Sequence, residues 1–134
     1  MQRALVTGTS SGIGLAIAEH LLGQGWAVSG FDMAPSRISH AAFEAVKVDL
    51  CDTPALQAAA SKVHPHALVH AAGVLRVGHL GGLKAADAQL MWQVHVQALS
   101  CIANIVVPRM ATAGSGRVVV IGSRVSKGFA GRSE

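Results

Sequence analysis

A glycine-rich segment near the N-terminus, TGTSSGIG at residues 7–14, is the feature that most constrains the fold. It follows the apolar run RALVT and leads into GIGLAIAEHLLGQG, in which apolar residues recur at helical spacing. A second apolar run, WAVSGF, comes next. A strand, a glycine turn, a helix and a second strand in this order predict a βαβ unit with two parallel strands.

The same alternation continues along the chain. Residues 34–43 carry no clear pattern, and we expect a poor helix or a loop there. Further strands are predicted at 44–50, 66–73 and 116–123, and further helices at 53–63 and 85–107. Parallel strands need right-handed crossovers, so this pattern predicts an α/β fold. We expect one Rossmann-type domain over residues 1–134, with a doubly wound parallel sheet of strand order 3-2-1-4-5.

The glycine turn has the features of a phosphate-binding loop. Gly8 allows the tight turn, Gly12 lets the backbone approach a pyrophosphate, and Gly14 permits close packing of the helix. The start of the helix also offers free N–H groups to an anion. A glycine-rich loop without a ligand is the alternative, and the flanking strand and helix argue against it. We expect a nucleotide cofactor to contact Gly8, Ser10, Ser11, Gly12, Ile13 and Gly14.

An aspartate follows the second predicted strand. Asp32 is at the distance from the glycine turn that dinucleotide-binding sequences require of their acidic residue. Its carboxylate would accept hydrogen bonds from the adenosine ribose hydroxyls, and its charge would repel a 2'-phosphate. The sequence therefore favours NAD, and the nearby Arg37 leaves NADP as the less favoured alternative.

These motifs resemble the short-chain dehydrogenase/reductase family in their order and intervals. The resemblance also rests on VDL at 48–50, LVHAAG at 68–73 and a strand ending in IGS at 123, and it covers essentially all 134 residues. It implies an NAD(P)-dependent oxidoreductase that exchanges hydride with an alcohol or carbonyl substrate. Within the family, GFD at 30–32 and AAGVLRVG at 71–78 are most similar to dehydrogenases of cyclic diols, of the dihydroxybenzoate-forming kind.

The resemblance implies further cofactor contacts. Asp49 would bind the adenine amino group, with the Leu50 backbone beside it. Ala72 and Gly73 would line the adenosine side of the cofactor. The family usually has two asparagines before this Ala-Gly pair, where this chain has His70 and an alanine.

Ser123 lies at the carboxyl end of the last predicted strand, at the sheet edge where ligands bind in such folds. Its hydroxyl can polarise a substrate carbonyl. The resemblance implies that it works with a tyrosine about 13 residues further on and a lysine about four residues after that, which together exchange a proton with the substrate. The sequence ends at Glu134 and contains no tyrosine. We therefore expect an N-terminal part of a longer enzyme, the alternative being a nucleotide-binding module without turnover.

His95 is a second candidate catalytic residue. It occupies a position where the family usually has an asparagine, whose backbone carbonyl holds a water that relays protons to the lysine. Histidine changes charge near neutral pH, so its imidazole could supply acid–base function itself. The favoured alternative is a histidine whose nitrogens are satisfied by structural hydrogen bonds. His70 presents the same choice, with the structural role favoured more strongly.

Composition limits the other functions. Hydrophobic residues make up 51% of the chain and charged residues 13%, which favours a packed core. The net charge is +4, but the eleven Lys and Arg residues are scattered, so a nucleic-acid partner is not expected. Cys51 and Cys101 lie far apart without ligand spacing, and we predict reduced thiols and no metal.

Location and assembly follow from the same analysis. The apolar run CIANIVVPRM is interrupted by Asn104 and Pro108, so no membrane-spanning segment is expected. The chain begins with a strand pattern and shows no leader peptide, which indicates a cytoplasmic protein. The family resemblance implies a homo-oligomer, to which Trp92 on the long predicted helix could contribute a helix-to-helix contact.

Overall fold

The computed structural model describes residues 1–127, so the last seven residues of the predicted 1–134 domain lie outside the described residues. Its strands are β1 (Arg3–Thr7), β2 (Ala27–Asp32), β3 (Phe43–Lys47), β4 (Ala67–His70) and β5 (Arg117–Val120). Its helices are α1 (Gly12–Gly23), α2 (Thr53–Ser61), α3 (Ala85–Trp92) and α4 (Ala98–Ala113), with a π-helix, η1 (Gln93–Gln97), between α3 and α4 and a 3-10 turn, η2 (Arg124–Lys127), after β5.

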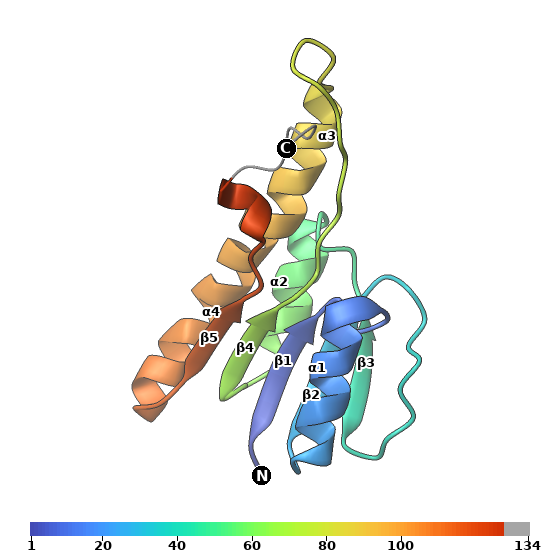
Figure 1. Ribbon diagram of the computed structural model, residues 1–134. Helices are drawn as coiled ribbons and strands as arrows, with labels where there is room; N and C mark the ends of the chain where they lie inside the picture. The colour runs from blue at the N-terminus through green and yellow to red at the C-terminus, as the bar shows by residue number, and fades with distance from the viewer. Residues whose placement is uncertain (128–134) are drawn as a thin grey trace.

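The strands form one sheet in the order β3-β2-β1-β4-β5, and every neighbouring pair is parallel. This confirms the doubly wound Rossmann-type fold and the strand order expected from the sequence. Helix α1 covers one face of the sheet, and α2 and α4 lie together on the other face (Figure 1). Alternate residues of β1 serve the two layers, because Ala4 and Val6 pack toward α1 while Leu5 packs toward α2 and α4.

The carboxyl ends of β1, β2 and β4 meet at one edge of the sheet, the upper end of the sheet in Figure 1. Thr7 at the end of β1 pairs with Phe31 of β2 on one side and with His70 of β4 on the other. The glycine turn, the residue after Phe31 and the segment after His70 therefore leave the sheet side by side. Such an edge is where open α/β sheets bind their ligands.

Three strands, β3, β4 and β5, end before their predicted last residues, which were 50, 73 and 123. Residues 48–50 follow β3 without joining it, although the Val48 N–H still donates to the Asp32 carbonyl at 3.1 Å. Residues 71–73 leave β4 because the Thr7 hydroxyl oxygen accepts the N–H groups of Ala71 and Ala72, each at 3.1 Å. Residues 34–43 contain no helix, so the loop alternative holds there.

The long helix runs further than the sequence suggested. It continues through Pro108 to Ala113, and Gly114, with a φ of 77°, ends it in the left-handed conformation. Proline usually breaks a helix because it lacks the N–H group, and here the helix tolerates that loss. The stretch Ala85–Ala113 has 29 residues and contains an 18-residue window of mean hydropathy 1.4, so by length and composition alone it is long and apolar enough to cross a membrane. Its buried residues Ile102, Val106 and Met110 belong to the sheet's core, as in the core helices of many non-membrane proteins.

Candidate functional site

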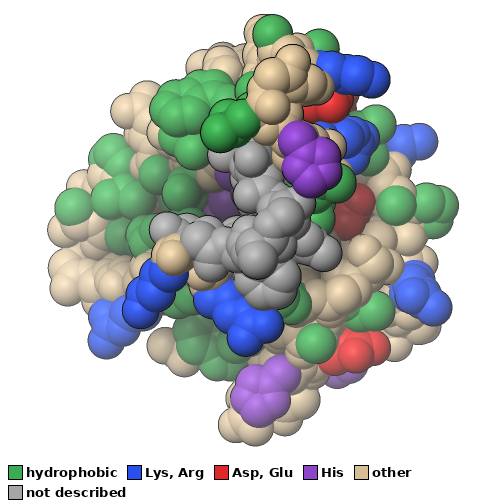
Figure 2. All heavy atoms as spheres, turned by 45° about the horizontal axis from the view of Figure 1, so that its top comes forward, with side chains coloured by type: hydrophobic (Ala, Val, Ile, Leu, Met, Phe, Trp, Pro, Cys, Tyr) green, Lys and Arg blue, Asp and Glu red, His purple; other side chains and the backbone are tan. Residues whose placement is uncertain are grey.

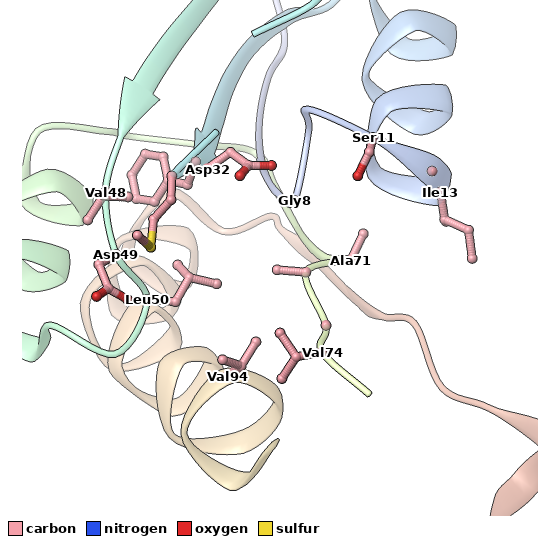
Figure 3. A pocket seen from close by; sticks show the side chains of 15 residues that line it. Gly8, Ser11, Ile13, Asp32, Val48, Asp49, Leu50, Ala71, Val74 and Val94 are labelled. Carbon is pink, nitrogen blue, oxygen red and sulfur yellow. The ribbon is translucent and has the colours of Figure 1, made fainter. Parts of the chain in front are cut away.

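A cleft of about 400 Å³ opens at the carboxyl edge of the sheet, between the glycine turn, the ends of β2 and β4, and the segment after β3. Figure 3 shows the Asp32 carboxylate near the Gly8 turn, with Asp49 and Leu50 on one wall. Val74 and Val94 lie on another wall, formed by the long helix and by residues 71–74, which follow β4 and are called the β4 exit below. Its lining residues are Gly8, Ser11, Gly12, Ile13, Phe31, Asp32, Met33, Val48, Asp49, Leu50, Ala71, Ala72, Gly73, Val74 and Val94.

The cleft brings together all the predicted cofactor residues except Ser10 and Gly14. It also contains residues that the sequence argument missed. Met33, Val48 and Ala71 are chain neighbours of predicted residues, so the motifs pointed to their segments. Val94 comes from η1, and no local pattern linked that helix to the cleft.

The glycine turn is held tightly against its surroundings. Gly8 has a φ of +76°, and a Cβ there would lie 2.7 Å from the Ala72 Cα. A Cβ on Gly14 would collide with the carbonyl oxygen of Gly8. These positions therefore require glycine: Gly8 for its backbone conformation and its approach to the β4 exit, and Gly14 for the packing of α1 under the turn. Gly14 acts below the cleft and does not line it.

The start of α1 suits an anion. Among the described residues no side chain caps the first turn of α1, and that turn contains no acidic residue. A Cβ on Gly12 would meet open space, so the backbone at this point is accessible from the cleft. The uncapped N–H groups and the helix dipole together fit a phosphate group, as the pyrophosphate of a dinucleotide would supply.

Asp32 is fixed in place by two backbone donors. The Ser10 N–H donates to Oδ2 at 2.9 Å, and the Ala34 N–H donates to Oδ1 at 3.0 Å. The Ser10 hydroxyl donates in turn to the Ala34 carbonyl oxygen at 3.0 Å. Ser10 therefore orients Asp32 and does not itself line the cleft. Each carboxylate oxygen retains acceptor capacity for a ligand hydroxyl.

Asp49 and Leu50 form the wall opposite Ser11 and Ile13 (Figure 3). One carboxylate oxygen of Asp49 accepts the Cys51 N–H at 2.9 Å, which closes a tight turn after β3. Burial, and then the negative charge of Asp49, raise the pKa of the Cys51 thiol above its usual value. A raised pKa keeps this sulfur as a neutral thiol near pH 7, so it has no nucleophilic role here.

A buried hydrogen-bond network lies beneath the β4 side of the cleft. His70 Nε2 lies 2.9 Å from the Val94 carbonyl oxygen, which can only accept, so Nε2 carries a proton. His70 Nδ1 then accepts from the Thr7 hydroxyl at 2.9 Å, while the Thr7 oxygen accepts the N–H groups of Ala71 and Ala72. Burial lowers the pKa of His70, which keeps the ring neutral. These contacts favour a structural role for His70.

His95 reaches the cleft wall from η1. Its Nε2 lies 2.8 Å from the Val74 carbonyl oxygen and 3.2 Å from the Val74 nitrogen. Its ring lies against Gly73, because a Cβ on that glycine would come within 3.0 Å of the His95 Cε1 atom. The imidazole is thus engaged with the backbone after β4, while the residue as a whole remains exposed.

Ser123 is exposed and follows the end of β5 by three residues. It is not among the residues that line the cleft, so the structure does not bring it together with the predicted cofactor residues. Within residues 1–127 no cluster of three or more His, Cys, Asp or Glu side chains is arranged to hold a metal ion. On the face shown in Figure 2, Lys and Arg side chains occupy several separate positions.

The five-stranded parallel sheet, with the cleft at its carboxyl edge, has the Rossmann-type arrangement. A family model described as short chain dehydrogenase matches residues 2–133. The chain therefore belongs to the short-chain dehydrogenase family.

Several solved structures resemble the chain. One is a short chain dehydrogenase/reductase family protein with 25% identity and a TM-score of 0.90. The match covers 96% of this chain and 58% of that protein. Another is a short-chain dehydrogenase from Streptomyces avermitilis, with 28% identity, a TM-score of 0.87, and coverage of 92% of this chain and 50% of that one. No curated protein gives a sequence match.

A third similar structure is the closed form of serine dehydrogenase complexed with NADP+, with 21% identity and a TM-score of 0.89, covering 97% of this chain and 58% of that one. At this identity the likeness concerns the fold alone. The chain spans about half to three fifths of the length of these three relatives.

Proposed function

We propose that the protein is an NAD-dependent oxidoreductase that transfers hydride between the nicotinamide ring and the carbon of an alcohol or carbonyl substrate. The observation that carries the proposal is the Asp32 carboxylate, held at the cleft by the Ser10 and Ala34 N–H groups. A carboxylate fixed at the end of the second strand, beside an uncapped helix start, suits the ribose and pyrophosphate of a dinucleotide.

The residues of the cleft have distinct roles in this proposal. The glycine turn and the start of α1 hold the pyrophosphate, and Asp32 accepts hydrogen bonds from the adenosine ribose. Asp49 and Leu50 lie on the adenine side, and Ala72 and Gly73 line the wall beside them. The bound nicotinamide gives or accepts hydride. Ser123 would orient and polarise the substrate oxygen from the end of the β5 segment.

The choice of NAD over NADP rests on charge. Asp32 would face a 2'-phosphate at close range, and two like charges at such a site disfavour binding. Arg37 is close in sequence and exposed, and it keeps NADP as the less favoured cofactor. The NADP+ named for the serine dehydrogenase structure belongs to that protein and does not decide the question.

Asp32→Ala tests the proposal through cofactor affinity. Hydrogen bonds to a charged group contribute roughly 1.5–3 kcal/mol, so calorimetric titration should show NAD binding roughly 10- to 100-fold weaker in this variant. The preference for NAD over NADP should also shrink. Glu44→Gln, which removes a carboxylate from exposed β3 away from the cleft, is the matched control and should bind NAD normally.

Asp32→Asn sharpens this test. An asparagine has one acceptor oxygen, whereas both the Ser10 and Ala34 N–H groups need an acceptor at this position. The amide should therefore bind NAD no better than the alanine variant. Unchanged NAD affinity in both Asp32 variants would refute the assigned role, and an unaltered protein that binds neither cofactor would refute the function.

Ser123→Ala tests the catalytic assignment in the complete protein. Loss of the hydroxyl should reduce kcat strongly while leaving NAD affinity nearly intact, because Ser123 does not line the cofactor cleft. Retained turnover would remove Ser123 from the site.

The predicted cyclic-diol substrate has no support in the names of the three similar structures, so we propose no substrate narrower than an alcohol or carbonyl compound.

We also infer a homo-oligomer and a cytoplasmic location for the protein. The outer face of the long helix carries exposed apolar side chains, including Trp92 at 60% and Val96 and Val107 at 38%. Exposed apolar patches of this kind favour association. Sedimentation equilibrium of the unaltered protein and of Trp92→Glu tests this, and a monomer in both samples would contradict it.

A further inference from the structure

The β4 exit and the π-helix are joined by two histidines that point in opposite directions. His70, the last residue of β4, reaches the Val94 carbonyl oxygen in η1 through Nε2 at 2.9 Å. His95, the next residue of η1, reaches back to Val74, just beyond β4. Each segment thus contributes one imidazole to the backbone of the other, and the four residues that follow His70, 71–74, all line the cleft.

The direction of the His95 hydrogen bond depends on whether Nε2 carries a proton. Nε2 is near both the oxygen and the nitrogen of Val74, at 2.8 and 3.2 Å, but a single nitrogen either donates to the oxygen or accepts from the N–H. The shorter distance is the one to the carbonyl oxygen, which can only accept. The geometry therefore favours the form in which Nε2 carries a proton and donates to Val74.

The imidazole ring also has a packing role. A Cβ on Gly73 would lie 3.0 Å from Cε1 and 3.6 Å from Nε2 of His95, so the ring occupies the space that a side chain at 73 would need. Glycine at 73 lets the ring approach the backbone, and the hydrogen bond to Val74 then fixes the next peptide. Packing against Gly73 and the hydrogen bond to Val74 therefore both hold the His95 ring against the cleft wall.

The π-helix explains why two consecutive residues can serve this wall. The wider turn of a π-helix changes the direction of its side chains and frees carbonyl groups from the regular helix pattern, and such turns are frequent at functional sites. In η1 the Val94 carbonyl oxygen faces His70, and the His95 side chain faces Val74. The helix therefore presents an acceptor and a donor to the β4 exit in succession.

We propose that the His95 side chain is a positioning residue for the cofactor cleft, which holds the wall formed by residues 71–74 in place through its Nε2–H bond to the Val74 carbonyl oxygen and its contact with Gly73. This inference deepens the proposed function, because the positioned wall is the one assigned to the adenosine side of NAD. A catalytic proton transfer by the His95 Nε2 would have to break this bond, so the side chain acts through the wall.

Three variants test the proposal. His95→Phe keeps an aromatic ring beside Gly73 but has no donor, and it should weaken NAD binding about three- to tenfold, the equivalent of one hydrogen bond. His95→Gln places an amide donor about as far from the backbone as Nε2, and it should bind NAD within about twofold of the unaltered protein. His64→Phe, at an exposed position in the loop after α2, is the control and should leave binding unchanged.

A second readout does not depend on the cofactor. In the protein without NAD, nitrogen NMR shifts should show His95 protonated at Nε2, and amide hydrogen exchange of Gly73 and Val74 should accelerate in His95→Phe but not in His95→Gln. Unprotonated Nε2 in neutral His95 would overturn the donor assignment. A Phe variant with unchanged exchange and unchanged affinity, or a Gln variant as weak as the Phe variant, would overturn the positioning role.

The two readouts separate this inference from the proposed function. An unaltered protein that binds no NAD but shows the expected exchange and nitrogen shifts would refute the function and retain the His95 contact. If every variant binds NAD normally, and if Gly73 and Val74 exchange as slowly in the variants as in the unaltered protein, the function would be retained and the inference refuted.

Discussion

β4 and β5 are adjacent parallel strands with similar apolar sequences, yet they differ greatly in burial. Leu68 of β4 pairs with Val118 of β5, and Val69 pairs with Val119. The β4 residues are 0% and 6% exposed, whereas their β5 partners are 46% and 45% exposed. A run of apolar residues indicates a strand that can be buried, and the neighbours of the strand decide whether it is.

The positions of the two strands account for the difference. β4 lies between β1 and β5, with the α1 layer over one face and the α2 and α4 layer over the other. Among the described strands β5 has β4 as its sole neighbour, so it forms an edge of the sheet. The predictions that follow test whether this contrast holds in solution, beginning with the largest effect.

Leu68→Ala should cause the largest loss of stability. The side chain is fully buried in the core between the sheet and α4, and its removal should lower the free energy of unfolding by about 2–5 kcal/mol. Urea denaturation followed by circular dichroism measures this loss. Val118→Ala, on the neighbouring strand at the same level, is the control and should cost much less. Equal losses would contradict the contrast between the strands.

The contrast also shows what the sequence could predict. The strands and the glycine turn follow from local patterns, because each depends on residues that are close in the chain, whereas the strand order follows from the Rossmann-type topology that the alternation of strands and helices indicates. The ends of the strands do not, since β4 stops where the hydroxyl of the distant Thr7 takes the N–H groups of residues 71 and 72. The passage of the helix through Pro108 likewise depends on packing against the sheet, which local propensity does not contain.

The candidate site divides in the same way. Gly8 and Asp32 carry recognisable local signatures, and the structure places both at one cleft. Val94 reaches the cleft through a π-helix that brings a distant part of the chain to the β4 exit. No sequence pattern near this valine predicts that it lines the cleft. The partners of His70 and His95 were likewise unpredictable, because each histidine contacts a residue more than 20 positions away.

A matched pair of valine substitutions, at the next residue pair along the strands, tests the difference in burial between β4 and β5. Val69→Ala should lower the free energy of unfolding by about 1.5 kcal/mol, since it removes two nearly buried methyl groups. Val119→Ala, its partner across the strand pair, should cost about half as much or less. Urea denaturation of both variants provides the comparison. Similar losses would mean that β5 is covered in solution.

In the last residue pair of the two strands, His70 of β4 faces Val120 of β5. We expect the His70 ring to make the stability of the protein depend on pH, with a smaller effect than the substitutions above. Burial lowers the pKa of His70 in the folded protein below its unfolded value of about 6.5. Below about pH 6.5 the unfolded chain therefore binds a proton that the folded protein does not, and stability falls as pH decreases toward the folded pKa. Above about pH 7 this contribution to stability is complete.

Denaturation between pH 5 and 8 measures this effect, whose slope for one group cannot exceed about 1.4 kcal/mol per pH unit. His70→Asn should show a shallower dependence on pH than the unaltered protein. His64→Asn removes an exposed histidine and should retain the original slope. A His70 variant with an unchanged slope would show that this ring does not carry the effect.

Val119→Lys should have the smallest effect on stability and a clear effect on association. The Val119 side chain is 45% exposed on an edge strand, where a lysine can extend into water, so the free energy of unfolding should change by no more than about 0.5 kcal/mol. Exposed apolar edge strands favour pairing with other chains, and an edge lysine opposes that pairing. Sedimentation velocity should therefore show less self-association than in the unaltered protein. If the lysine instead lowers stability by several kcal/mol, the valine must be covered in solution, and β5 would then resemble β4 in its surroundings as well as in its sequence.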